Sequence, residues 1–212
     1  MNRKKIKTAD LPAFTGGHFD SVDFSESELN KDNMSDAVFN SCNFYNNETR
    51  SGCSFRGCKL RNAIFINCDL TLCRFEFADL FGAEFRDCRL IGTNFERSSF
   101  AEQLTGKKYI CSGKIENSNL SNASLAGLLL QGGSLKGNRW YETDIEKADF
   151  SGADLSEGEF SGIHWGTANF TGCDLRGASL QGLNLRTTDL SGVILDSWQA
   201  CLLVSALGVT VI

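Results

Sequence analysis

The sequence predicts an all-β solenoid, a stack of similar coils, in which each coil has four sides. The first observation is a large apolar residue at every fifth position, whereas an α-helix repeats after about 3.6 residues and a strand after about 2. The second is a regular alternation of Phe and Leu along this series, and the third is the abundance of glycine, 21 residues against one proline. Sustained self-similarity of this kind is the signature of a solenoid. The uninterrupted part of the series comprises Phe55, Leu60, Phe65, Leu70, Phe75, Leu80, Phe85, Leu90, Phe95 and Phe100, and the series resumes at Ile115 and runs to Leu195.

Each five-residue unit, or pentad, is expected to form one side of a coil. The large residue, here called the centre, and a small residue two positions before it point inward, and the residue between them points outward, as alternation along a strand requires. The last two residues turn the corner, and successive coils stack at a strand spacing of about 4.8 Å. The Phe–Leu alternation favours four sides because pentads ten residues apart then face each other and fill the interior evenly. This arrangement stacks Phe55, Phe75 and Phe95 on one side, opposite Phe65 and Phe85, with Leu60, Leu70, Leu80 and Leu90 on the other two sides.

The nine cysteines follow the repeat and do not have the spacing of a metal or disulfide framework. Seven of them occupy the small inward position, where other pentads carry alanine. A free thiol is a common small apolar core residue. No pair has CxxC spacing and only two histidines are present, so we expect no zinc site and no cofactor. The seven are Cys42, Cys53, Cys58, Cys68, Cys73, Cys88 and Cys173.

Two interruptions of the period predict loops that leave the coil at its corners. They cover Asn46–Cys53 and Glu102–Gly113, and both are rich in polar residues. Loops on a rigid scaffold are common recognition sites, although a tolerated insertion explains the pattern equally well. The candidate binding residues are Asn46, Asn47, Glu48, Thr49, Arg50 and Ser51 in the first loop, and Glu102, Gln103, Leu104, Thr105, Gly106, Lys107, Lys108, Tyr109, Ile110, Cys111 and Ser112 in the second.

The end of the chain changes character and predicts a separate C-terminal module. Asp196 followed by Gln199 forms a capping-box pattern for a short helix that Gly208 closes, and residues 209–212 are β-like. We therefore expect a solenoid over residues 1–195 and a helix with a strand over 196–212. The module either caps the last coil or, because it is so apolar, joins two copies end to end as a homodimer. The expected dimerisation residues are Trp198, Cys201, Leu202, Leu203 and Leu207.

Composition and motifs exclude several functional classes. A formal charge of −5 argues against direct nucleic-acid binding. No apolar run reaches the roughly 20 residues of a membrane span, and no apolar segment follows the polar N-terminus, so a cytoplasmic location is expected. His18 and His164 lie far apart and lack a neighbouring nucleophile motif, and no phosphate-binding glycine loop is present. The protein is therefore expected to be neither an enzyme nor a binder of a small-molecule substrate.

Many pentads carry a carboxylate at the outward position. Asp154 and Asp174 lie one coil apart and should stack at roughly one strand spacing, an arrangement that a basic partner would relieve. The alternative is that each Asp bonds its own corner, as Asn does elsewhere in the repeat. The expected acidic surface comprises Asp144, Asp149, Asp154, Glu159, Asp174 and Asp189.

Specific segments give the chain a resemblance, over essentially its whole length, to the Qnr group of pentapeptide repeat proteins. These segments are Asn43-Phe44-Tyr45, Ser51-Gly52-Cys53-Ser54-Phe55, Asn138-Arg139-Trp140, Asp154-Leu155-Ser156-Glu157-Gly158-Glu159-Phe160, and the tail Leu195-Asp196-Ser197-Trp198-Gln199-Ala200-Cys201-Leu202-Leu203.

The resemblance implies a right-handed quadrilateral β-helix that dimerises through its C-terminal module. It also implies that the protein binds DNA gyrase and topoisomerase IV, protects them from quinolones, and mimics duplex DNA. The longer loop is the more important one for protection in that family. A β-helical scaffold, or a gyrase inhibitor without protecting activity, is the alternative.

Overall fold

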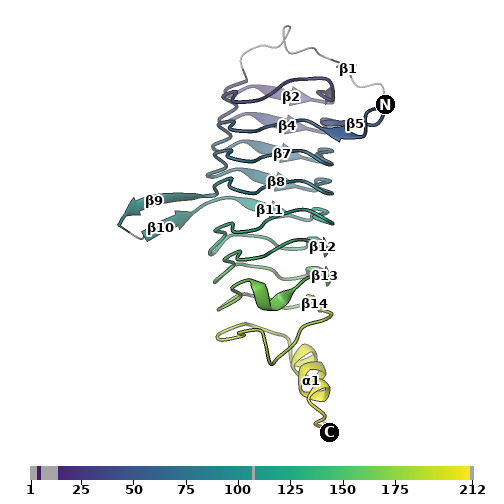
Figure 1. Cartoon of the computed structure of the whole chain (residues 1–212), viewed down its shortest axis with the longest axis vertical. Helices are drawn as coiled ribbons and strands as arrows, with labels where there is room; N and C mark the ends of the chain where they lie inside the picture. Colours follow the sequence, from purple (N-terminus) through teal and green to yellow (C-terminus); the bar gives the residue numbers. More distant parts are fainter. Residues whose placement is uncertain (1–3, 6–13, 107, 211–212) are drawn as a thin grey trace.

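The protein is a rod of stacked coils with a hairpin on its side and a helix at one end (Figure 1). The computed structural model describes residues 4–5, 14–106 and 108–210. Within these ranges no helix combines the length and the apolar character that crossing a membrane requires. The elements are β1 Lys4–Lys5, β2 His18–Asp20, β3 Val22–Asp23, β4 Val38–Asn40, β5 Tyr45–Asn46, β6 Ser51–Gly52, β7 Ile64–Ile66, β8 Glu84–Arg86, β9 Ala101–Thr105, β10 Lys108–Cys111, β11 Lys114–Glu116, β12 Arg139–Tyr141, β13 Glu159–Ser161, the 3-10 helix η2 Trp165–Thr167, β14 Ser179–Leu180 and α1 Ser197–Ala206.

Parallel pairing between coils confirms the four-sided repeat. Residues 20 apart in sequence face each other on successive coils, as in the bridge between Asp149 and Asn169. A parallel five-stranded sheet runs along one side of the rod and consists of β2, β4, β7, β8 and β11. A parallel three-stranded sheet of β12, β13 and β14 lies on the neighbouring side. The offset between facing residues grows to 26 where the first interruption lies and to 30 at the second. The first interruption therefore inserts six residues (26 − 20) and the second ten (30 − 20) into a coil that is otherwise 20 residues long.

The phenylalanines form the predicted columns inside the rod. The ring centroids of Phe55 and Phe75 lie 4.6 Å apart and those of Phe75 and Phe95 lie 5.1 Å apart, with nearly parallel planes. The Phe65 and Phe85 rings stack in the same way at 4.9 Å, and Phe75 meets Phe85 edge to face at 5.7 Å. All five side chains are fully buried. Both arrangements are favoured for aromatic pairs, so the core is a layered stack in which each coil packs on its neighbours.

The corners explain the glycine content. In a typical corner the Cys58 N–H donates to the Phe55 carbonyl at 3.0 Å, which closes a four-residue turn. The second corner residue has positive φ, as at Gly57, where φ is +68°. Glycine and asparagine tolerate this left-handed conformation best, which is why they recur at this position.

Seven of the nine cysteines occupy the core, as predicted. All seven thiols at the small inward position are buried, and among the described residues no disulfide is formed. Several thiols donate to backbone carbonyls of the preceding coil, as Cys88 does to Phe65 and Cys173 to Phe150. The described residues also contain no cluster of metal-ligating side chains.

The C-terminal end of the rod is less well covered than the middle. Leu195 packs against the core, but it is only partly buried, as are Leu185 and Leu190. The predicted helix forms as α1, and Gly208 follows it with φ of +83°. The expected strand over 209–212 is not formed at residues 209 and 210, and residues 211 and 212 lie outside the described part of the chain.

Candidate protein-interaction surface

The first interruption forms a short β-hairpin that projects from a corner. Strands β5 and β6 pair antiparallel, with Tyr45 opposite Gly52. The Asn46 carboxamide oxygen accepts hydrogen bonds from the backbone of Glu48 and Thr49 at 2.9 and 3.1 Å, which orders the turn. Residues 47–51 are exposed. Cys53, which we expected to end the loop, belongs to the coil, because it is buried and its N–H already donates to the Phe44 carbonyl.

The second interruption is also a regular hairpin and not an irregular loop. Strands β9 and β10 pair antiparallel from Ala101 opposite Cys111 to Thr105 opposite Lys108, with a register shift beside Lys108. Gly106 has φ of +58° and allows the turn. Lys107 lies outside the described residues. Ser112 and Gly113 lie at the corner, where the Ser112 N–H donates to the Phe100 carbonyl at 2.9 Å.

The distal part of the second hairpin exposes large apolar side chains. Leu104 is 61% exposed, Tyr109 47% and Ile110 46%. The hairpin extends away from the rod in Figure 1, on the side opposite β5. Because the hairpin projects in this way, the core does not cover these three side chains. Exposed apolar groups of this kind mark interaction sites.

Arg61 fixes the base of this hairpin and was not predicted from the sequence. Its guanidinium group forms ion pairs with Glu102 at 2.8 Å and with Asp79 at 3.2 Å, and it lies 4.6 Å from the centroid of the Phe81 ring. The hydrogen bonds to Glu102 and Asp79 raise the pKa of Arg61 above its already high value. Arg61 precedes the hairpin by two coils, so only knowledge of the coil length could have placed it there.

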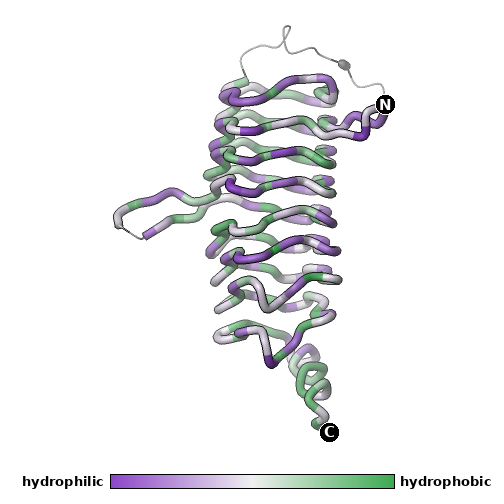
Figure 2. The backbone as a smooth tube through the Cα atoms, viewed as in Figure 1, coloured by the Kyte–Doolittle hydropathy of each residue, from purple (hydrophilic) through white to green (hydrophobic). Residues whose placement is uncertain are grey.

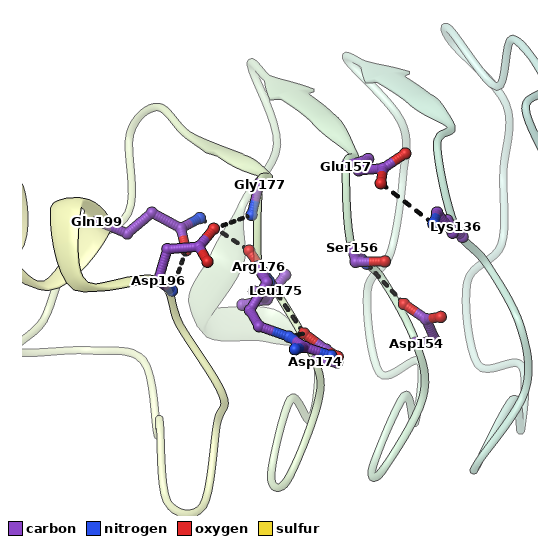
Figure 3. Close-up of polar contacts among 10 residues, drawn as sticks. All are labelled: Lys136, Asp154, Ser156, Glu157, Asp174, Leu175, Arg176, Gly177, Asp196 and Gln199. Carbon is purple, nitrogen blue, oxygen red and sulfur yellow. Dashed lines mark hydrogen bonds and ion pairs between the residues drawn. The ribbon is translucent and has the colours of Figure 1, made fainter.

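The acidic residues bond mainly to their own corners, as in the second of the two interpretations. Asp154 and Asp174 do pair on successive coils, but Asp154 accepts from the Ser156 N–H at 2.9 Å, and Asp174 is held by Arg176 at 2.6 Å (Figure 3). The hydrogen bonds from Arg176 lower the pKa of Asp174. The repulsion that we expected a basic partner to relieve is therefore already offset within the chain.

The six expected acidic residues do not share one surface. Consecutive pentads occupy consecutive sides, so Asp144, Asp149, Asp154 and Glu159 lie on four different sides, each paired with the coil before it. Glu159 also forms an ion pair with Arg139 at 2.8 Å. Asp149 has a lowered pKa because hydrogen bonds from Ser151, Gln131 and Asn169 outweigh its partial burial. Hydrogen bonds from Ser191 likewise lower the pKa of Asp189.

The C-terminal module presents an apolar groove. Helix α1 is hydrophobic along most of its length (Figure 2), and Trp198, Leu202 and Leu207 are 52%, 62% and 57% exposed. Cys201 is exposed and Leu203 is partly buried. A groove of about 510 Å³ lies between α1 and the last coils.

Polar contacts attach α1 to the rod. The Gln199 carboxamide donates to the carbonyls of Leu175 and Ala178, both at 2.8 Å, and accepts from the Asp196 N–H. The Asp196 carboxylate accepts from the Gly177 N–H at 2.6 Å (Figure 3). The predicted bond between Asp196 and Gln199 is thus present, and the same two residues also fix the angle at which the helix leaves the rod.

A four-sided coil of five-residue units defines a pentapeptide repeat protein, and comparison with known families agrees. The family model Pentapeptide repeats matches eight copies, over residues 51–76, 78–102, 118–162 and 148–192. The chain is 40% identical over 132 residues to the quinolone resistance pentapeptide repeat protein QnrB96 of Scandinavium goeteborgense, and 40% identical over 141 residues to QnrB4 of Escherichia coli. These matches cover 62% and 66% of this chain and the same shares of the two relatives.

Solved structures give the more particular assignment. A trypsin-treated variant of QnrB1, a plasmid-mediated fluoroquinolone resistance protein, is 38% identical over the whole of both chains, with a TM-score of 0.94. Full-length QnrB1 gives a TM-score of 0.90 at 39% identity, over 97% of this chain and 95% of the other. The chain therefore belongs to the Qnr family of pentapeptide repeat proteins. Of these relatives, QnrB96 is named as a quinolone resistance protein and QnrB1 as a fluoroquinolone resistance protein.

Proposed function

We propose that this protein binds DNA gyrase and topoisomerase IV and protects them from quinolones. The observation that carries the proposal is the second hairpin, a regular element that displays Leu104, Tyr109 and Ile110 and is anchored by Arg61. An anchored hairpin loses little conformational freedom on binding, which favours affinity. The names of its relatives, which describe resistance to quinolones, support the choice of partner.

The proposed activity is protein binding in the cytoplasm and not catalysis. His18 and His164 are both exposed, and neither has the buried, hydrogen-bonded setting typical of a catalytic base. Contact through the hairpins is favoured over mimicry of duplex DNA by the whole rod, because the six expected acidic residues are distributed over all four sides and two of them, Glu159 and Asp174, are paired with arginines. The proposed assembly is a homodimer joined at the groove beside α1.

The test is gyrase supercoiling at a fixed inhibitory dose of a quinolone, with this protein titrated in. We expect the intact chain to restore supercoiling at low protein concentration. A variant lacking the ten residues 102–111 joins Ala101 to Ser112 and restores the five-residue spacing between Phe100 and Ile115. That variant should keep its β-sheet circular dichroism and its thermal midpoint but lose protection.

A matched variant removes the six residues 47–52 and joins Asn46 to Cys53, which restores the spacing between Phe44 and Phe55. It tests the first hairpin by the same criterion. Inhibition of gyrase without rescue by the intact chain would instead favour an inhibitor without protecting activity. No effect of the intact chain in either direction would refute the proposed function and leave a scaffold.

A further inference from the structure

Two bulky apolar residues occupy corner positions that favour glycine or asparagine. Leu72 and Phe77 have φ of 55° and 62°, and every other residue with positive φ in the described part of the chain is glycine or polar. Their side chains are 42% and 49% exposed. At the corner one coil before Phe77, the corresponding position carries Gly57. Neither turn geometry nor core packing therefore accounts for these two side chains, and strained residues of this kind cluster at functional sites.

Arginines surround Phe77. The guanidinium carbons of Arg56 and Arg97 lie 5.2 and 5.5 Å from the centroid of its ring. Arg74 lies on the outward face of the same pentad, between the Leu72 and Phe77 corners, and is exposed. Among the residues that the structure describes, none of these three arginines forms an ion pair. We call Arg56, Leu72, Arg74, Phe77 and Arg97 together the Phe77 patch.

The patch borders a hollow with a net positive lining. The hollow has a volume of about 370 Å³, and Lys31, Arg56 and Arg74 contribute its cations. Its single lining carboxylate, Glu76, accepts a hydrogen bond from Asn94 at 3.4 Å. The remaining lining residues are Asn30 and Ser54. The hollow therefore offers free cationic groups beside an exposed aromatic ring, in a chain whose formal charge is −5.

The patch is also continuous with the first hairpin. Gly52, the last residue of β6, packs directly on the next coil at Leu72, where an added Cβ would lie 2.3 Å from the Leu72 carbonyl carbon. A partner that contacts the first hairpin would therefore reach Leu72 and the rest of the patch without crossing the rod.

We propose that the Phe77 patch is a docking surface for an acidic segment of a protein partner that carries an aromatic or aliphatic side chain. Carboxylates would pair with the free arginines, and charge-assisted bonds to Arg are strong and geometrically specific. The apolar side chain would cover Phe77 and Leu72, with the arginines already stacked on the ring. A nucleic acid fits less well, because Glu76 and Glu96 border the patch and the chain as a whole is acidic. If the proposed function holds, the segment belongs to the topoisomerase.

Binding of a fluorescently labelled short peptide of Glu and Asp with interspersed Phe and Leu tests the proposal directly. Phe77→Asn introduces a residue that suits this corner conformation, since asparagine occupies the corresponding position of other corners at Asn62 and Asn67. We expect this variant to bind the peptide about tenfold more weakly, with a thermal midpoint equal to or above that of the intact chain. Arg56→Gln should weaken binding similarly and flatten its dependence on salt. Lys147→Asn alters the same corner several coils away and should leave peptide affinity unchanged.

Three results would overturn the proposal. One is equal peptide affinity in the intact chain and Phe77→Asn. Another is tighter binding of a single-stranded oligonucleotide that also depends on Phe77, which would make the patch a nucleic-acid site. The third is a clear fall in the thermal midpoint of Phe77→Asn, which would give Phe77 a structural role. A separate measurement of gyrase binding keeps the two proposals apart, because peptide binding through Phe77 without gyrase binding would refute only the proposed function.

Discussion

Single residues in this protein take their roles from their position in the pentad. A cysteine two residues before a centre is buried in the coil, whereas Cys201 on α1 is exposed. This much was predictable from spacing alone. The role of a corner residue was not predictable in this way. Leu72 and Phe77 occupy ordinary corner positions of the five-residue period, and nothing in the period indicates that their side chains are exposed. Exposure at a corner depends on which neighbours lie above and below, and those come from other coils.

Burial predicts that the seven core thiols are chemically silent in the native protein. Desolvation raises the pKa of Cys53 and of Cys173 to about 12 and that of Cys58 to about 11, so the reactive thiolate is scarce at pH 8. A disulfide reagent such as DTNB should modify at most Cys111 and Cys201 before unfolding, and all nine thiols after it. Rapid native labelling of a third thiol would contradict the packing.

A second expectation at this scale concerns the aromatic columns. Phe75→Ala removes a ring that stacks on Phe55 and Phe95 and is fully buried. We expect a loss of about 3–5 kcal/mol in the free energy of unfolding, since the cavity cannot close without moving neighbouring coils. Chemical denaturation monitored by circular dichroism measures this loss. The outward Arg89→Ala is the control and should change stability by less than about 1 kcal/mol.

At the scale of elements, the sequence located both insertions but not their conformation. The residues of β9 and β10 do not alternate clearly between polar and apolar, because both faces of the hairpin are exposed. Alternation arises only where one face is buried. The anchor at Arg61 escaped prediction for a related reason, since its contact with Glu102 spans 41 residues. The lack of strand structure at residues 209 and 210 has the same cause, as a strand needs a partner that the sequence of one segment does not reveal.

The anchor makes a prediction about the second hairpin. Arg61→Gln removes both ion pairs and the contact with Phe81, so the base of the hairpin should open more often. Trypsin should then cleave after the exposed Lys108 about two to five times faster. Arg89→Gln, whose nearest carboxylate is Asp69 at 3.9 Å, should leave the rate unchanged. Equal rates in all three proteins would show that the hairpin holds its orientation without Arg61.

The whole molecule was the most predictable scale. A period of five with alternating Phe and Leu specifies both the coil and its four sides, because only one arrangement layers the large side chains evenly. The distribution of acidic residues was wrongly predicted, because steps of five residues carry successive carboxylates around the rod and not along it. Only carboxylates separated by whole coils of 20 residues, such as Asp154 and Asp174, share one side of the rod.

The uncovered end leads to an expectation for the assembly. Removing residues 197–212 deletes α1 and with it one wall of the apolar groove. The truncated chain should be monomeric in light scattering, with a lower thermal midpoint because Leu180 and Leu183, which line the groove beside α1, lose cover. Leu202→Glu is a milder test of the proposed dimer interface at this groove and should also give monomers. A dimeric truncated chain would mean that the interface lies elsewhere on the rod.

The two hairpins leave and re-enter the rod at closed corners, where the Cys53 and Ser112 N–H groups bond to the Phe44 and Phe100 carbonyls. Selection on either hairpin is thereby uncoupled from selection on the core. Mutations can lengthen, shorten or rewrite these segments without changing a single inward residue, so a lineage can explore new partners while its folding stability stays constant. The rod can therefore stay constant while the two hairpins vary, because the inward residues of the coils do not take part in either hairpin.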